Sequence, residues 1–298
     1  MPSRRSYLAG AGSMIAAAAG CTSGGDETPD GDVTPTGDGK TPTGDRKTPT
    51  DDGETPTPPP DGVELADIGA RKAVTYESTL GSGGVLAAEG RQYVAASVVT
   101  GVETTAAAFA LAAGGETYDP GLPDTAGGLN RSVAGRSGQP LGSGGFDPGE
   151  TAMLVFVVPS PLSAPAAEIR YDGDAGPWPL GGSARRTLAA PEPRYELASF
   201  EAPETVDQGR SLSTSMTVRN VSDTDGRFLA ALYWPTELAD DDESHRLERP
   251  VAAGETATLE RSIDTRYTTS EDGPVSLRLR GHVAAERTVR VTGAETPS

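Results

Sequence analysis

The chain has 298 residues, of which 43 are Asp or Glu and 25 are Lys or Arg, so its formal net charge is −18. A surface of this charge repels nucleic acids and anionic lipid headgroups, which excludes both as partners. The chain has a single cysteine, which excludes an intramolecular disulfide.

The basic residues are unusual in kind, because only Lys40, Lys47 and Lys72 are lysines and all the others are arginines. Many carboxylates, few lysines and few large apolar side chains resemble the proteins of salt-loving archaea, in which molar salt screens the self-repulsion. This resemblance implies that low salt destabilises the fold. An ordinary acidic protein is the alternative, which explains the charge but not the scarcity of lysine.

Residues 1–21 have the parts of an export signal. Arg4 and Arg5 form a basic region, and an apolar run of about twelve residues follows, which is too short to span a bilayer. The paired arginines and the Ser-Tyr-Leu after them resemble a twin-arginine signal, whose pathway exports folded proteins, although Tyr7 replaces the usual Phe. We therefore expect export by this route.

The export signal ends in Ala18-Ala19-Gly20-Cys21, which resembles a lipobox, with Ala18 where leucine is usual. In a lipobox the cysteine thiol is alkylated by a lipid and becomes the mature N-terminus. Because Cys21 has no partner thiol, an anchoring role explains it better than a redox role. We predict a lipid-anchored protein on the outer face of the cell membrane; the alternative is a buried Ala-rich helix with a chance cysteine.

Residues 22–61 form a linker that repeats every seven residues from Thr34. Each unit contains proline and no apolar residue, so the tract can neither continue a helix nor form a coiled-coil seam. We expect a disordered to polyproline-II-like spacer. Its Thr-Pro composition is typical of O-glycosylated stalks.

Residues 62–190 are predicted to form a first β-sandwich, because short runs of β-branched and apolar residues alternate with turn signals. The segment 152–158 is apolar on both faces, as in a central strand. The segment 119–146 is expected to be a long Gly-rich connection, either functional or mobile. The expected strands are 73–77, 92–100, 107–112, 151–158 and 168–171.

Residues 191–298 are predicted to form a second sandwich of roughly seven strands, a size typical of an immunoglobulin-like domain. Leu277 and Leu279 alternate with Arg278 and Arg280, which predicts one buried face and one wet face. A proline-bearing joint at 189–193 separates the sandwiches. The fold class is therefore all-β, with two tandem immunoglobulin-like β-sandwiches after the signal and the linker.

The two sandwiches share an internal correspondence. Gly149-Glu-Thr-Ala-Met-Leu in the first sandwich recurs as Gly254-Glu-Thr-Ala-Thr-Leu in the second. Upstream, a set of Val, Val, Thr and Phe ends at Phe109 in the first sandwich, and the same four residue types recur at the same spacing in the second sandwich, where the set ends at Phe228. Chance among Gly/Thr/Val-rich hairpins is the alternative. The correspondence predicts two copies of one architecture, the first of which carries an insertion.

Each of the two predicted sandwiches resembles a known family of domains. The second sandwich, with Thr217-Val-Arg-Asn-Val-Ser and Val251-Ala-Ala-Gly-Glu-Thr, is similar to the CARDB-like domains of prokaryotic surface proteins. The first, with Gln92-Tyr-Val and Leu154-Val-Phe-Val-Val-Pro, resembles the telokin-like domains of bacterial and archaeal lipoproteins. These motifs are strand and turn patterns, so the resemblance carries over no functional residues.

Residue patterns for catalysis are missing from the sequence. Histidine occurs only at His245 and His282, without a metal-binding spacing, and the folded part has no cysteine for blue copper. There is no Gly-x-Ser-x-Gly elbow and no Ser-x-x-Lys pair. We predict no enzyme and no cofactor, and we expect both histidines to be structural or surface residues.

Two further sets of side chains are candidate sites. An acidic run is a weak calcium candidate, although a solvated loop explains it equally and it lacks the register of an EF-hand. Asn130 and Asn220 are the only asparagines, and both begin an Asn-x-Ser triplet, which predicts N-glycosylation at positions reachable from outside. The acidic run consists of Asp240, Asp241, Asp242 and Glu243.

The sequence therefore predicts a non-catalytic lipoprotein that presents β-sandwiches to another envelope protein or a glycan. The alternative is an accessory solute-binding or assembly subunit of a membrane complex, which would use the Gly-rich connection and nearby aromatic residues. Those aromatic residues are Tyr118, Phe146, Trp178 and Trp234.

Overall fold

The computed structural model describes residues 62–78, 83–123, 125, 130–140, 148–149, 151–237, 243–269 and 271–294. They belong to one compact unit that extends from Glu54 to Ser298. The signal with Arg4, Arg5 and Cys21, the linker, Phe146 and the run Asp240, Asp241 and Asp242 lie outside the described residues. No helix within the described residues has the length and apolarity needed to cross a membrane.

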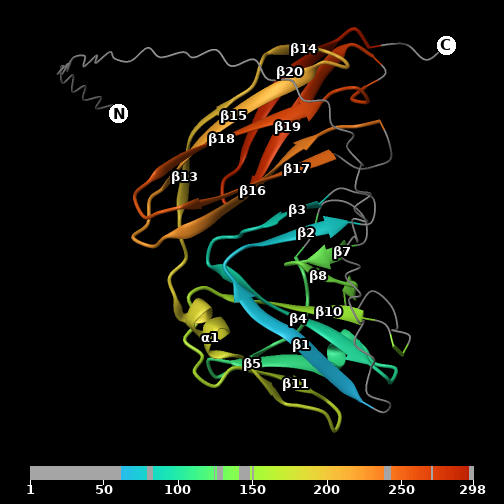
Figure 1. Cartoon of the computed structure of the whole chain (residues 1–298), viewed down its shortest axis with the longest axis vertical. Helices are drawn as coiled ribbons and strands as arrows, with labels where there is room; N and C mark the ends of the chain where they lie inside the picture. The colour runs from blue at the N-terminus through green and yellow to red at the C-terminus, as the bar shows by residue number, and fades with distance from the viewer. Residues whose placement is uncertain are drawn as a thin grey trace, which may run out of the picture. The chain divides into compact units, whose positions relative to one another are not determined.

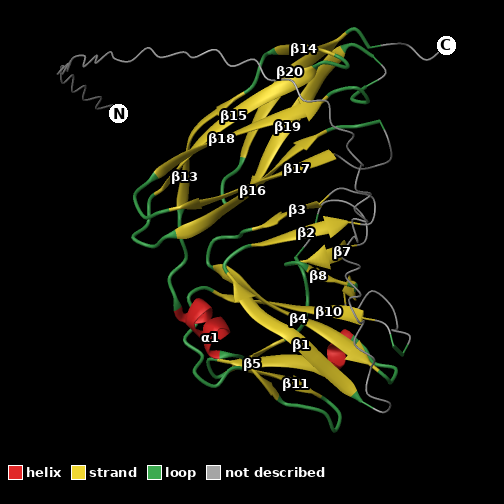
Figure 2. Cartoon of the chain, viewed as in Figure 1, coloured by secondary structure: helices red, strands yellow, loops and turns green. Residues whose placement is uncertain are grey.

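The described chain is nearly all β, which confirms the predicted fold class (Figure 2). The first half contains β1 (Val63–Arg71), β2 (Val74–Ser78), β3 (Gly83–Leu86), β4 (Arg91–Thr100), the 3₁₀ turn Ala106–Ala108, β5 (Phe109–Ala113), β6 (Glu116–Tyr118), β7 (Asn130–Val133), β8 (Arg136–Ser137), β9 (Gln139–Pro140), β10 (Thr151–Pro159), β11 (Glu168–Tyr171), β12 (Trp178–Pro179) and α1 (Gly182–Ala189). The second half contains β13 (Tyr195–Glu201), β14 (Thr205–Asp207), β15 (Ser211–Asn220), β16 (Gly226–Trp234), β17 (Glu243–Val251), β18 (Thr256–Asp264), β19 (Gly273–Gly281) and β20 (Ala285–Thr292).

The first half is built around a central sheet with the strand order β1-β4-β10-β9, here sheet A. One face of sheet A packs on the sheet β12-β11-β5-β6 (sheet C), with Phe109, Phe156 and Ile169 in the shared core. The other face packs on the sheet β3-β2-β7-β8 (sheet B), around Tyr93 and Met153. Strands β4 and β10 are therefore buried on both faces, as the apolar run 152–158 predicts for β10.

The second half consists of sheet D, with the order β13-β15-β18, and sheet E, with the order β14-β20-β19-β16-β17. Its core lies between these sheets and is filled by alternate residues of each strand, such as Leu277 and Leu279. The intervening Arg278 and Arg280 are on the opposite face of β19. The alternation predicted from the sequence is thus confirmed for this strand.

The two halves share a strand order. The run β1-β4-β10 corresponds to β13-β15-β18, and β12-β11-β5-β6 corresponds to β20-β19-β16-β17. Phe109 in β5 and Phe228 in β16 are both buried. Gly149 and Gly254, with φ of 96° and 76°, lie in the turns before β10 and β18, where a left-handed conformation favours glycine. The internal sequence correspondence therefore falls on equivalent elements.

The expected long connection at 119–146 is wrong in part, because β7, β8 and β9 lie within it. β7 pairs with β2, and Val133 is fully buried against sheet A. These strands have two to four residues each, too few for an alternation to be recognised in the sequence. The helix α1 was also not predicted. The insertion in the first sandwich therefore completes sheet B.

Sheet B also contacts the second sandwich, where β3 lies beside β16 and β17 (Figure 1). Val85 packs against Leu229, Ala231 and Tyr233 in a small buried cluster, here called the bridging cluster, which also contains Ala73. At the rim of the cluster the backbone N–H of Gly83 donates to Ser244 Oγ at 2.9 Å. Sheet B thus joins the two sandwiches.

Candidate functional site

Asn220, one of the two predicted glycosylation residues, is at the end of β15 but is fully buried. Its amide nitrogen donates to the carbonyls of Thr224 (2.8 Å) and Val251 (3.0 Å). Its Oδ1 accepts from both the backbone and the hydroxyl of Ser222. The expectation that Asn220 is reachable is therefore wrong. The Asn-x-Ser triplet here is a local hydrogen-bonding motif that ties β15 to the following turn.

Two other predicted site residues lie at strand ends. Asn130 begins β7, where its backbone pairs with Ser78. Glu243 begins β17, opposite Trp234 in β16. The described residues contain no group of three or more His, Cys, Asp or Glu side chains that could hold a metal ion.

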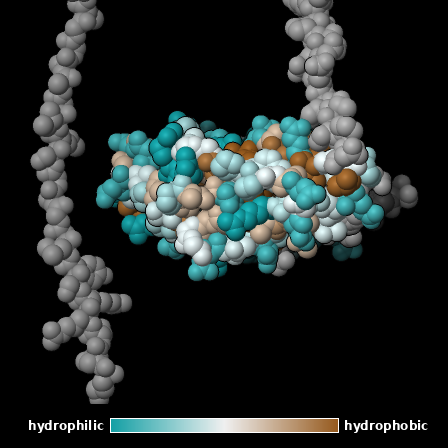
Figure 3. All heavy atoms as spheres, turned by 90° about the horizontal axis from the view of Figure 1, so that it is seen from below, coloured by the Kyte–Doolittle hydropathy of each residue, from teal (hydrophilic) through white to brown (hydrophobic). Residues whose placement is uncertain are grey.

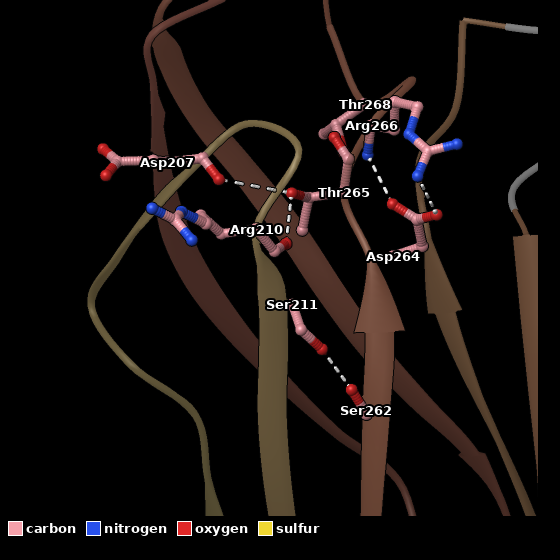
Figure 4. A network of polar contacts seen from close by, with 8 residues as sticks. All are labelled: Asp207, Arg210, Ser211, Ser262, Asp264, Thr265, Arg266 and Thr268. Carbon is pink, nitrogen blue, oxygen red and sulfur yellow. Dashed lines mark hydrogen bonds and ion pairs between the residues drawn. The ribbon is translucent and has the colours of Figure 1, made fainter.

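The three aromatic residues of the alternative prediction that the structure describes do not gather at one site. Tyr118 and Trp178 lie on opposite edge strands of sheet C. Trp234 is buried in the core of the second sandwich, where its Nε1 donates to Thr268 Oγ1 at 2.6 Å. Figure 4 shows a polar network that includes Thr268, in which Thr265 donates to the carbonyl of Arg210 at 2.7 Å. Trp234 therefore has a structural role.

Both histidines are held inside the second sandwich. The His282 ring lies against Tyr195 and Phe228, and its Nδ1 accepts from the backbone N–H of Leu229 at 2.9 Å. Burial lowers the pKa of His282 to about 4, so the ring is neutral at pH 7. His245 is buried in β17 beside Arg261, with 3.3 Å between Nδ1 and Nη2. The contacts of His282 identify it as a structural residue.

The most concentrated polar arrangement among the described residues is at the joint between the sandwiches. The Lys72 amine donates to Gln92 Oε1 (2.7 Å), Ser160 Oγ (3.0 Å) and the carbonyl of Ala190 (2.6 Å). Gln92 is fully buried, and its amide donates to the carbonyls of Pro159 and Leu188. Lys72 therefore fixes the chain after α1 to sheet A.

The joint at 189–193 was predicted from the sequence, but the role of Lys72 in it was missed, although a signal for that role was present. Lys72 is one of three lysines in a chain that otherwise uses arginine. An ammonium group can direct three donors at separate acceptors, which a planar guanidinium cannot do in the same space. Burial lowers the pKa of Lys72, and nearby Glu192 opposes this shift. The Glu192 carboxylate also accepts from the backbone N–H of Gly90 at 2.9 Å.

Two clefts flank the joint, and Lys72 and Pro193 line both. The first cleft, about 270 Å³, has Glu89, Glu192 and Glu196 in its lining. The second, about 310 Å³, has Lys72, two arginines and one aspartate. The face in Figure 3 is a mosaic of hydrophilic and hydrophobic residues. Tyr267 is the one large apolar side chain exposed within the described part of the chain.

Comparisons with known proteins give no family. No family model matches the chain, and no curated protein matches it. The chain is similar to a solved β-glucosidase from Listeria innocua, with 18% identity and a TM-score of 0.30 over 36% of this chain and 17% of that one. A β-glucosidase from Streptomyces venezuelae gives 11% identity and a TM-score of 0.27 over 79% of this chain and 47% of that one. The chain thus spans less than half the length of either enzyme.

Proposed function

We propose that the protein is a non-catalytic lipoprotein of the cell surface. A lipid on Cys21 would hold it at the outer face of the membrane after export through the signal that contains Arg4 and Arg5. The linker at 22–61 would act as a spacer. The folded part would present two β-sandwiches, immunoglobulin-like in type, to another envelope protein or a glycan.

One observation carries the presenting role: the buried or half-buried polar side chains at the joint bind backbone groups of the protein itself. Lys72, Gln92 and His282 each make such contacts, and Asn220 does the same in the second sandwich. Groups used in this way hold chain segments in place and are not available for proton transfer or nucleophilic attack. A folded part whose polar side chains are used in this way supports the proposal that it presents its surface to a partner.

The anchor is tested by replacing Cys21→Ser and following the protein through membrane fractionation. The variant should appear in the medium, because without the thiol no lipid can be attached. Thr22→Ser is the matched control and should stay with the membrane. If the Cys21→Ser protein also sediments with the membrane, the anchor is wrong and the N-terminal segment is a retained signal helix.

The presenting role is tested separately by detergent extraction and affinity purification of the full chain from native membranes. A surface module should be recovered alone or with sub-stoichiometric partners. Recovery at a fixed stoichiometry with a membrane complex would instead support the accessory-subunit alternative.

A further inference from the structure

The second joint cleft has a charge opposite to that of the whole protein. Its lining includes the cations Arg71, Lys72 and Arg227 and one carboxylate, Asp225, which gives a local charge of +2 from three positive groups and one negative group. The whole chain has a net charge of −18. A cationic cleft in such a chain is therefore a local feature that its composition does not explain.

The cations are only partly neutralised by the protein. The Lys72 amine donates to neutral oxygens alone, and the Asp225 carboxylate accepts from the backbone N–H of Ala253 at 2.9 Å. Arg227 pairs with Glu248, and Arg71 makes no hydrogen bond or ion pair with a described residue. Arg71 is exposed at the end of β1, so its donors are accessible to a ligand.

The lowered pKa of Glu248 indicates the same excess of positive charge. Its pKa is lowered by the hydrogen bond from Arg227, and the charges of Arg227, Arg246 and Arg71 add to this effect. Because Arg246 also pairs with Glu77, with 3.3 Å between Nη2 and Oε1, the excess of positive charge near Glu248 comes from Arg227 and Arg71. A second carboxylate placed between Arg71 and Arg227 would meet attractive charges that Glu248 does not saturate.

The rest of the cleft lining is mostly apolar, and Thr187 and Thr224 are its polar side chains. Short apolar side chains from β1 and from the segment after α1 line it, together with Leu229 of β16. The volume of about 310 Å³ is at the lower end of the range for small-molecule pockets, and such pockets occur preferentially between domains. The apolar residues of the wall are Ala70, Ala73, Ala190, Pro191, Pro193 and Leu229.

We propose that this cleft binds a small organic carboxylate. The carboxylate group would accept hydrogen bonds from the guanidinium groups of Arg71 and Arg227, and the apolar body would lie against the proline and alanine wall. Lys72 would contribute its charge but no hydrogen bond, because its donors are already used. This site is independent of the lipid anchor and of the presenting role.

The test uses butyrate as the probe, with inorganic phosphate and butanol at matched ionic strength. Calorimetric titration of the full chain should show butyrate binding, weaker phosphate binding and no butanol binding. Arg71→Gln should weaken butyrate binding about tenfold, because a charge-assisted bidentate contact is lost. Arg219→Gln, an arginine on the outer face of sheet D, should leave it unchanged.

Two results would overturn the proposal. Equal butyrate affinity in the wild type and in Arg71→Gln would show that the cleft is not the site. Phosphate binding as tight as butyrate would show that only charge is recognised, so the apolar wall would have no part in binding. Thermal unfolding of Arg71→Gln checks that the variant is folded. The experiment with Cys21→Ser tests the lipid anchor alone, so its outcome does not depend on carboxylate binding in this cleft.

Discussion

Gly84→Ala tests whether sheet B joins the two sandwiches. A Cβ at Gly84 would meet the hydroxyl oxygens of Tyr233 and Tyr76, the latter at 2.5 Å, well inside the distance that real Cβ contacts keep. Those two hydroxyls are 3.4 Å apart and buried between sheets B and E. The extra methyl must therefore displace a tyrosine from each sandwich or move β3 itself.

Overpacking of this kind costs about 1–3 kcal/mol of the free energy of unfolding. For a unit of this size the loss corresponds to a fall in Tm of about 2–12 °C. Differential scanning calorimetry in molar salt measures it directly. Gly273→Ala is the matched control, because Gly273 begins β19 with open space around its Cβ position and should change stability by less than about 0.5 kcal/mol.

The double variant Gly84→Ala/Tyr233→Phe sharpens the test. Removing the Tyr233 hydroxyl makes room for the added methyl, so the double variant should be more stable than the sum of the single changes predicts. The reasoning fails if Gly84→Ala and Gly273→Ala unfold at the same temperature. It also fails if the Gly84→Ala and Tyr233→Phe effects simply add.

Three further changes test individual contacts. The pKa of His282 is about 4 in the folded protein and 6.5 in the unfolded chain. Its contribution to the free energy of unfolding, about 3 kcal/mol, is therefore complete above pH 6.5 and is lost as the pH falls toward 4. In His282→Gln the free energy of unfolding should change less with pH in that window. Asn220→Ala should lower the free energy of unfolding in urea by about 2–3 kcal/mol, because two buried carbonyls lose their donor. A wild-type peptide carrying a glycan at Asn220 would contradict the buried role. Lys72→Met should lower the free energy of unfolding by about 1–3 kcal/mol, whereas Lys72→Arg should retain only part of that stability. If Lys72→Arg is as stable as the wild type, the need for an ammonium group is refuted.

The sequence predicted the long strands β4 and β10, because apolar runs are local properties, but it missed β1, which is as long as β10. The segment 152–158 is apolar on both faces, and β10 is indeed buried on both faces of sheet A. Leu277 and Leu279 were assigned correctly to the core for the same reason. The turns at Gly149 and Gly254 were also recognised, since left-handed backbone there favours glycine.

The candidate site could not be predicted in the same way, because its residues meet only through tertiary structure. Asn220 has the same triplet as an accessible glycosylation residue, and only its burial against Val251 separates the two cases. Gly84 gave no local signal of its role, which depends on a tyrosine far along the chain. Arg71 and Arg227 line one cleft because β1 and β16 come from different sandwiches.

The sequence by itself determined the all-β class, the strands long enough to show a period and the expectation of an exported, anchored chain. Tertiary structure alone decided that the inserted segment completes the sheet that joins the sandwiches, that Lys72 fixes the joint and that cations gather in one cleft. The physical reason is the range of each effect. Periodicity acts between neighbouring residues, whereas burial, steric fit and charge clustering depend on residues that only the folded chain brings together.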